Sequence, residues 1–205
     1  MNIANPCIEE VEKYLAIWYS SENDMAKERA LDKLFLTTYR LNKCVDDVLV
    51  KVSVLNDIYD TNLFNTFAMA SHIVDLDIDD RLQKADDMLV MDIAKMTLPN
   101  GKVINFYSFA TKYCSRHRPK DFPIYDSYVD RVLRYFRDVD AFCKFNSRDL
   151  KDYPIFKLVI SKFRDFYGLE EYDFKKLDMY LWRLGKEKFS KMGAQNSVYV
   201  KNQRG

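Results

Sequence analysis

A carboxylate, Asp126, stands at the end of a short segment whose residue types and spacing favour chemistry. The segment reads Phe-Pro-Ile-Tyr-Asp over residues 122–126. Pro123 fixes its own φ angle and biases the residue before it toward extended backbone, so the segment is stiff. A helix is predicted to begin just after the carboxylate, because apolar residues follow at helical spacing. These are Val129, Leu133 and Phe136. Asp126 is therefore either a helix N-cap, the simpler interpretation of this segment alone, or a candidate catalytic base.

The residues before this segment resemble the core of the helix-hairpin-helix (HhH-GPD) DNA glycosylases. In that family a helix carries a Lys or, in the adenine-excising branch, a Ser, and an Ala stands two positions later. A loop ending in Pro-Ile/Val-x-Asp then supplies the essential carboxylate. Ser108, Ala110 and the 122–126 segment fall on these places without a gap, and the likeness is strong over residues 104–133 and faint over residues 55–94. The resemblance implies an all-α, HhH-GPD-like fold with two helical lobes around a DNA-binding cleft.

The resemblance also implies a reaction. Cleavage of an N-glycosidic bond builds positive charge on the sugar, and a carboxylate near C1′ stabilises that cation and orients the attacking water. Asp126 matches that group. Ser108 is similar to the residue of the monofunctional members, which stop at an abasic site, whereas members with Lys attack the sugar through an amine and nick the strand. Lys112 lies one helical turn after Ser108 on the same face, so it is either a displaced amine or a surface side chain.

The chain departs from the family pattern in its hairpin. The family carries Gly-x-Gly there, which lets backbone amides approach a DNA phosphate, whereas this chain has Ile104 and Phe106. The turn must therefore have a different shape. An iron–sulfur cluster is not expected, because the cysteines are scattered without metal-ligand spacing. They are Cys7, Cys44, Cys114 and Cys143. We expect reduced thiols and neither a metal nor another cofactor.

A base that is to be excised must leave the helical stack, so the enzyme needs an aromatic and polar pocket together with phosphate contacts. Each pocket candidate could instead be a core or cap residue. The pocket candidates are Asn56, Asp57, Tyr59, Asn62, Phe64, Tyr107 and Tyr125. The candidates for a phosphate track precede the Asp126 loop or lie near the C-terminus. They are Arg116, His117, Arg118, Lys120, Lys186 and Lys188, followed by Lys191, Lys201 and Arg204.

The composition is typical of a helix-rich, compact protein. The 205 residues are 48% hydrophobic and 15% aromatic, with only five Gly and five Pro. Such a chain can form one domain, which we assign to residues 1–185, followed by a basic C-terminal tail over residues 186–205. No alternating strand pattern competes with the helices, and Gly185 is expected to end the helix that begins near Asp173.

Charge and terminal patterns bear on partners and location. The net charge of +1 gives no general attraction to nucleic acid, but acidic residues concentrate over 75–92 and basic residues over 112–120. No apolar run approaches the about 18 residues needed to span a bilayer, and the N-terminus lacks a signal-peptide pattern. We therefore expect a monomeric, cytoplasmic protein without a membrane partner.

The functional prediction is a monofunctional DNA glycosylase that flips out and excises a modified base from double-stranded DNA. By analogy, a glucosylated hydroxymethylcytosine of phage DNA is the expected kind of base, and antiviral defence the expected role. Two alternatives stay open. One is a non-catalytic helical DNA-binding protein, which the missing hairpin glycines favour. The other is a helical protein-interaction module, in which Asp126 is only a cap and residues 75–92 form the partner surface.

Overall fold

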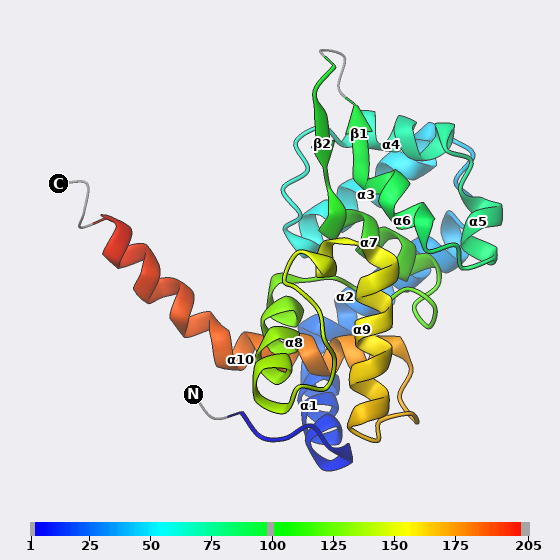
Figure 1. The fold of residues 1–205 in the computed structure, drawn as a ribbon. Helices are drawn as coiled ribbons and strands as arrows, with labels where there is room; N and C mark the ends of the chain where they lie inside the picture. Colours follow the sequence, from blue (N-terminus) through cyan, green and yellow to red (C-terminus); the bar gives the residue numbers. More distant parts are fainter. Residues whose placement is uncertain (1–2, 98–100, 202–205) are drawn as a thin grey trace.

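The structure is a computed structural model that describes the backbone of residues 3–97 and 101–201, with side chains through residue 190. Helices make up most of this part of the chain, which confirms the all-α prediction (Figure 1). A two-stranded hairpin is the only sheet among the described residues. None of the helices in those residues combines the length and the apolar character needed to cross a bilayer.

The helices and strands follow one another along the chain from α1 near the N-terminus to α10 near the C-terminus. They are α1 (Ile8–Ser20), α2 (Glu22–Asp32), the π-helical turn η1 (Lys33–Thr38), α3 (Val45–Tyr59), α4 (Thr66–Asp75), α5 (Asp79–Gln83), α6 (Met88–Ala94), β1 (Lys95–Thr97), β2 (Val103–Asn105), α7 (Tyr107–His117), α8 (Ser127–Asp140), the 3₁₀ turn η2 (Asp149–Lys151), α9 (Tyr153–Phe166) and α10 (Phe174–Lys201).

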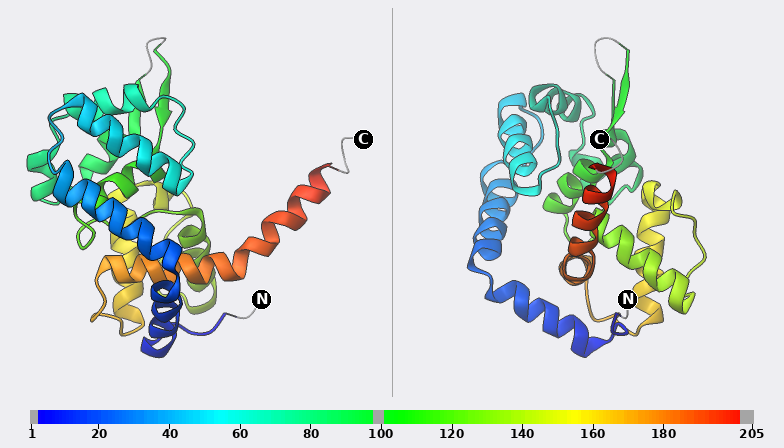
Figure 2. Two further views of the ribbon diagram at one scale, coloured as in Figure 1. Left: turned by 180° about the vertical axis from the view of Figure 1, so that it is seen from behind. Right: turned by 90° about the vertical axis from the view of Figure 1, so that its left-hand side faces the viewer.

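The helices form two groups, and α2 and α7 lie between them (Figures 1 and 2). One group contains α3, α4, α5, α6 and the hairpin, and α3 packs directly on α4. The other contains α1, α8, α9 and α10, in which α10 packs on both α8 and α1. Because α7 carries Ser108 and Lys112, the candidate catalytic side chains start from the centre of the molecule.

Buried aromatic residues attach the loop before α8 to the core. Tyr153, at the start of α9, is buried and stacks on the Phe122 ring with the two centroids 6.1 Å apart. The hydroxyl of Tyr153 donates a hydrogen bond to the carbonyl oxygen of Pro123 over 3.1 Å. Since both loop residues are themselves buried, the segment that leads to Asp126 belongs to the packed interior rather than to a free surface loop.

The hairpin corrects the sequence prediction that no strand is present. Helix α6 ends at Ala94, and β1 then pairs with β2 in antiparallel register, with Met96 opposite Ile104. The N–H of Phe106 donates a hydrogen bond to the Ala94 carbonyl over 2.8 Å, which extends the pairing to the start of α7. That amide is therefore not available to a DNA phosphate, whereas in a glycine-rich hairpin the corresponding amide would be free to bind one.

Gly185 lies inside α10 and not after its end, so the predicted helix end is wrong. At this point α8 crosses α10 so closely that a Cβ atom on Gly185 would lie 2.7 Å from Cβ of Tyr128 and 2.8 Å from its carbonyl oxygen. Glycine is required here for close approach rather than for an unusual φ angle. Residues 186–201 continue α10 as helix, and Lys191, Lys201 and Arg204 have side chains outside the described residues.

Candidate functional site

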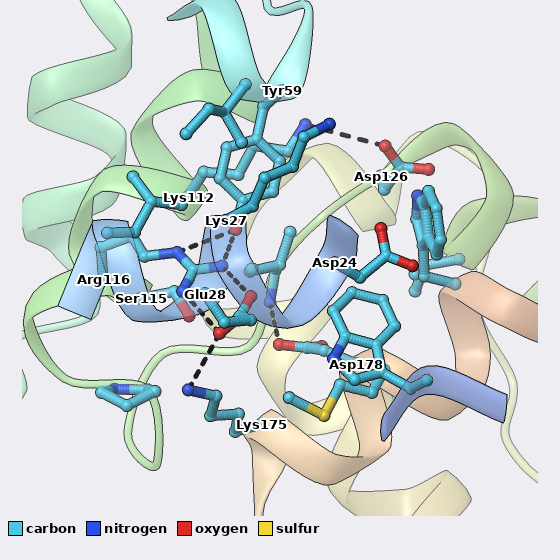
Figure 3. Close-up of a pocket in the computed structure, with 18 of the residues that line it drawn as sticks. Asp24, Lys27, Glu28, Tyr59, Lys112, Ser115, Arg116, Asp126, Lys175 and Asp178 are labelled. Atoms are coloured by element: carbon cyan, nitrogen blue, oxygen red, sulfur yellow. Dashed lines mark hydrogen bonds and ion pairs between the residues drawn. The ribbon is translucent and has the colours of Figure 1, made fainter. Parts of the chain in front are cut away.

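Side chains from α1, α2, α3, α7, α8 and α10 surround a cavity of about 480 Å³ (Figure 3). A cavity of this size holds a small organic ligand. Its wall mixes basic and acidic side chains, so a polar or charged ligand would find partners of both signs. The basic members include Lys27, Lys112, Arg116, Lys175 and Lys186, and the acidic members include Asp24, Glu28, Asp126 and Asp178.

Asp126 is both a helix cap and a lining residue of this cavity. Its Oδ1 atom accepts a hydrogen bond from the backbone N–H of Tyr128 over 2.8 Å, which caps α8. Its Oδ2 atom lies 3.7 Å from Nζ of Lys112, and 19% of the Asp126 side chain is exposed. The N-cap interpretation is confirmed, but the Asp126 carboxylate also borders the cavity. One oxygen fixes the carboxylate to α8 while the other stays at the cavity (Figure 3).

The loop that delivers Asp126 is held from the α10 side as well as from α9. The N–H of Ile124 donates a hydrogen bond to Oδ2 of Asp178 over 2.9 Å. Thr111 of α7 supplies a third attachment, because its Oγ1 atom accepts from the N–H of Tyr125 over 3.2 Å. Successive loop residues are thus tied to three helices, which fixes the carboxylate as a preorganised catalytic group requires.

Lys112, rather than Ser108, reaches the cavity from α7. The Lys112 ammonium is almost fully buried, donates a hydrogen bond to Oγ of Ser108 over 2.8 Å, and lies 5.3 Å from the centroid of the Tyr59 ring. The Ser108 hydroxyl in turn donates to the carbonyl oxygen of Tyr125 over 3.3 Å and does not line the cavity. Burial lowers the pKa of the Lys112 ammonium, and the neighbouring Asp126 carboxylate opposes that shift.

Arg116 forms a buried ion pair in the cavity wall, so its assignment to an exposed phosphate track is corrected. Its Nη1 and Nη2 atoms donate to the two carboxylate oxygens of Glu28 over 2.8 and 2.5 Å, in the bidentate geometry that suits guanidinium and carboxylate. Its Nε atom donates to the hydroxyl of Tyr59 over 2.8 Å. Burial raises the pKa of the Glu28 carboxyl, but Arg116 and Lys175 outweigh it, and the net pKa is lowered. This cluster joins α2, α3, α7 and α10.

The other residues predicted to contact DNA differ in how far their side chains are exposed, and the two that follow Arg116 do not reach the cavity. His117 is corrected, because its ring packs 5.1 Å from the Phe35 centroid and burial, with a smaller effect of Lys51, lowers its pKa to about 3. A neutral, half-buried imidazole offers no positive charge to a phosphate. Arg118 pairs with Asp121 and faces a second groove away from Asp126.

Three of the lysines predicted to contact phosphates are at least partly exposed. Lys120 is largely exposed and pairs loosely with Asp173 over 3.9 Å. Lys186 is exposed on the cavity rim, where its Nζ atom lies 4.5 Å from the centroid of the Trp182 ring. Lys188, on the next part of α10, is half-buried and pairs with Glu187. Of these side chains, Lys186 is the one that borders the cavity.

Of the predicted base-pocket residues, Tyr59 lines the cavity and the others do not. Asn56 instead fastens the loop after α3, since its side chain accepts from the N–H of Leu63 and donates to the Leu63 carbonyl. Asp57 and Asn62 lie outside the cavity. The expectation for these three residues is corrected.

The two remaining tyrosines and Phe64 are also placed elsewhere. Tyr107 and Tyr125 are buried in the core with ring centroids 5.1 Å apart, and the Tyr125 hydroxyl donates to Asp130. Phe64 is exposed and its ring contacts Phe106 rather than the cavity. These aromatic residues follow the usual behaviour of side chains at helical spacing, which pack inside or against neighbours.

Sequence reasoning missed the contributions of α1 and α2 to the site and, apart from Lys186, those of α10. Glu28, Asp178, Trp18 and Trp182 were not candidates, although all line the cavity. A signal was available in α10, because several lining residues recur three or four positions apart and therefore share one helix face. These are Lys175, Asp178, Met179, Trp182 and Lys186. Among the described residues, no group of three or more His, Cys, Asp or Glu side chains is arranged to hold a metal ion.

A protein family described as an N-terminal domain, HI_0787_N, matches residues 10–121 of the chain. The chain is also 47% identical over 148 residues to a protein of Haemophilus influenzae that carries the name "Uncharacterized protein", and this match covers 72% of the chain and 70% of that protein. No solved structure matches the chain. The chain therefore belongs to the HI_0787_N family. The matched range includes Glu28, Tyr59, Lys112 and Arg116 and ends before Asp126.

Proposed function

We propose that the protein is a monofunctional DNA glycosylase that binds double-stranded DNA, extrudes one nucleotide and excises a modified base, leaving an abasic site. The observation that carries the proposal is the position of Asp126. Its carboxylate is fixed as the cap of α8, and Oδ2 remains at a cavity of about 480 Å³, 3.7 Å from the Lys112 ammonium. A nucleobase extruded from a duplex fits a cavity of this size.

Asp126 supplies the electrostatic part of the proposed reaction. As the bond between the base and C1′ breaks, positive charge develops on the sugar, and a fixed carboxylate beside C1′ stabilises that charge. The same carboxylate orients a water molecule and accepts its proton as the water attacks C1′. Because Oδ1 is held by the helix cap, Oδ2 is the oxygen that serves both steps.

The positive charge of Lys112 offsets the negative charge of the Asp126 carboxylate. The Lys112 ammonium pairs with Asp126 and donates a hydrogen bond to Ser108, and both contacts favour the charged form, which is not a nucleophile. A second chemistry is favoured by one observation, namely that the amine and not the Ser108 hydroxyl lines the cavity. In that alternative the deprotonated Lys112 attacks C1′ and displaces the base, the sugar ring opens to give a Schiff base at C1′, and β-elimination expels the 3′ phosphate and so cleaves the strand.

The rim of the cavity offers surfaces for base and backbone. Trp18 and Trp182 line it with their rings edge to face, 5.7 Å apart, and aromatic faces stack on bases irrespective of sequence. Lys27 and Lys186 are exposed at the same cavity and suit contacts to phosphates. By analogy with the resemblance in the sequence, we propose glucosylated hydroxymethylcytosine of phage DNA as the base, antiviral defence as the role, and a monomeric, cytoplasmic protein.

A non-catalytic helical DNA-binding protein is the second candidate. It is favoured by the hairpin, where the amide of Phe106 is bonded to Ala94 and cannot bind a phosphate. Such a protein would bind DNA but release no base.

One incubation distinguishes the two candidates. The protein is mixed with phage DNA containing glucosylated hydroxymethylcytosine, with phage DNA containing unglucosylated hydroxymethylcytosine, and with unmodified host DNA. Abasic sites are then counted with an aldehyde-reactive probe. The glycosylase proposal predicts abasic sites in modified DNA only. DNA binding without abasic sites in any of the three would favour the second candidate and contradict the proposal.

A further inference from the structure

Asp178 is a buried carboxyl in the cavity wall with one oxygen unused. Its Oδ2 atom accepts the hydrogen bond from Ile124, whereas Oδ1 is buried and has no hydrogen-bond partner among the described residues. The whole residue is 7% exposed and comes from the face of α10 that borders the cavity. Figure 3 shows it at the lower side of the cavity, across from Lys112 and Asp126. A buried polar atom without a hydrogen-bond partner is energetically unfavourable, which suggests that Oδ1 has a partner when a ligand is bound.

The surroundings of Asp178 favour its neutral form. Burial raises the pKa of this carboxyl well above its ordinary value, and the nearby Asp173 and Asp126 add to that effect. The Ile124 N–H and the Arg116 guanidinium act in the opposite direction but do not cancel it. The titratable groups that interact electrostatically with Asp178 lie on, or directly before, five helices. They are Tyr59 of α3, Arg116 of α7, Asp126 before α8, Tyr153 of α9 and Asp173 before α10.

A neutral carboxyl has a different hydrogen-bonding capacity from a carboxylate. With Oδ2 accepting from Ile124, the proton resides on Oδ1, which becomes a donor that points to no acceptor among the described residues. A ligand that enters the cavity would supply an acceptor for this donor. Met179, the next residue of α10, also lines the cavity, and its unbranched side chain can move to admit one.

We propose that Asp178 reads the extruded base, as a neutral acid that donates a hydrogen bond from Oδ1 to an acceptor atom of that base. This inference rests on the proposed function and adds the chemistry of recognition to it. The ligand it selects is a base that presents a carbonyl oxygen or an unprotonated ring nitrogen toward α10. The pyrimidine edge of cytosine and of hydroxymethylcytosine carries both. Asp126 acts on the sugar, and Asp178 acts on the base.

The two tryptophans of the chain make the cavity observable without catalysis. Trp18 and Trp182 are the only tryptophans in the sequence, and both line the cavity. Their intrinsic fluorescence therefore reports the entry of a ligand. The probes are hydroxymethyldeoxycytidine, its glucosylated form and deoxyadenosine, each titrated against the full-length protein.

Variants of Asp178 test whether its side chain contributes to binding as a hydrogen-bond donor. Asp178→Asn keeps a donor in the form of an amide N–H and keeps an acceptor for Ile124, so hydroxymethyldeoxycytidine should bind within about twofold of wild type at neutral pH. Asp178→Ala removes the donor and should weaken binding about tenfold, the effect of one lost hydrogen bond. Asp165→Asn, a matched change of a half-exposed carboxylate on α9 outside the cavity, should have no effect.

The dependence of binding on pH gives the second readout. Wild-type affinity should fall as pH rises and Asp178 ionises, because a carboxylate cannot donate, whereas Asp178→Asn should bind equally well over the same range. An unchanged affinity in Asp178→Ala, a lost affinity in Asp178→Asn, or the same pH dependence in both proteins would overturn the inference about Asp178 alone. Failure of every probe to bind wild-type protein would overturn the assignment of the cavity as a base pocket.

Discussion

The Nζ atom of Lys112 lies 3.7 Å from Oδ2 of Asp126, although one residue belongs to α7 and the other precedes α8. The two side chains meet because the loop between the helices is packed into the core and because Asp126 caps α8 with its second oxygen. The ion pair therefore joins the part of the cavity formed by α7 to the part formed by α8 and α10. The proposed chemistry depends on this one relationship.

The engagement of Lys112 leads to a prediction about the reaction product. Its ammonium is hydrogen-bonded to Ser108 and paired with Asp126, and both contacts favour the protonated form, which cannot attack C1′. Borohydride added during turnover should therefore trap no covalent protein–DNA adduct. Strands should break only after alkali or heat acts on the abasic site. A gel of denatured reaction products measures both. An adduct that disappears in Lys112→Ala but persists in Ser108→Ala would contradict the monofunctional mechanism and favour amine attack.

The buried pair of Arg116 and Glu28 should contribute to stability far more than a surface pair does. Glu28→Gln leaves the buried Arg116 guanidinium with only the more distant and more exposed Asp32 carboxylate, 3.7 Å away, which should lower the free energy of unfolding by about 3 kcal/mol. Glu10→Gln, which removes the partner of the exposed Lys13 side chain, should lower it by less than about 0.5 kcal/mol. Urea denaturation of both variants provides the comparison. Equal effects would mean that the cluster does not hold the cavity wall together.

Asp178 should make stability fall with rising pH. Its pKa is raised in the folded state, so above the ordinary pKa of Asp, about 3.9, the unfolded chain releases a proton that the folded protein keeps. The stabilising contribution of the neutral acid is therefore complete below that pH and is lost as pH rises toward the folded-state pKa.

Asp178→Asn removes this proton linkage. Thermal unfolding measured at a series of pH values should show the stability of the variant gaining on wild type by up to about 1.4 kcal/mol for each pH unit within the window. Parallel stability curves for the two proteins would mean that Asp178 is already ionised in the folded state.

The exposed lysines at the cavity should contact DNA phosphates. Lys27→Ala and Lys186→Ala should weaken DNA binding to the same extent for all sequences, and each should reduce the salt dependence of the affinity by about one unit of logarithmic slope. Lys13→Ala, an exposed position on α1 that does not line the cavity, is the control. Fluorescence anisotropy over a series of salt concentrations measures the slopes. Slopes equal to that of the control would place the DNA elsewhere on the protein.

The helical class and the start of α8 could be predicted from the sequence because both depend on local patterns. Apolar spacing after Asp126 predicted the helix, and the Pro-stiffened segment before it predicted the cap. Gly185 was misread for a physical reason. A glycine that ends a helix and a glycine that admits a crossing helix look the same in sequence, and only the contact with Tyr128 tells them apart.

The rest of the site depended on contacts between distant residues. The ion pair of Glu28 with Arg116 joins positions far apart in the chain, and no local pattern connects them. Burial also decided against His117, whose charge would otherwise suit DNA. The position of Asp178 opposite Asp126 likewise required the packing of α10 against α8. Residue type indicated which groups could do chemistry, and tertiary packing determined which of them share a cavity.

The activity of Asp126→Asn tests the central claim most directly. Asn is as good an N-cap as Asp, and Lys112 keeps its hydrogen bond to Ser108, so the variant should fold and bind DNA while lacking the negative charge beside C1′. Asp152→Asn makes the same change at the cap of α9, outside the cavity, and serves as the matched control. The measurement is the single-turnover rate of abasic-site formation in modified phage DNA. We predict a loss of at least about a hundredfold for Asp126→Asn and no loss for Asp152→Asn, and a fully active Asp126→Asn protein would contradict the account.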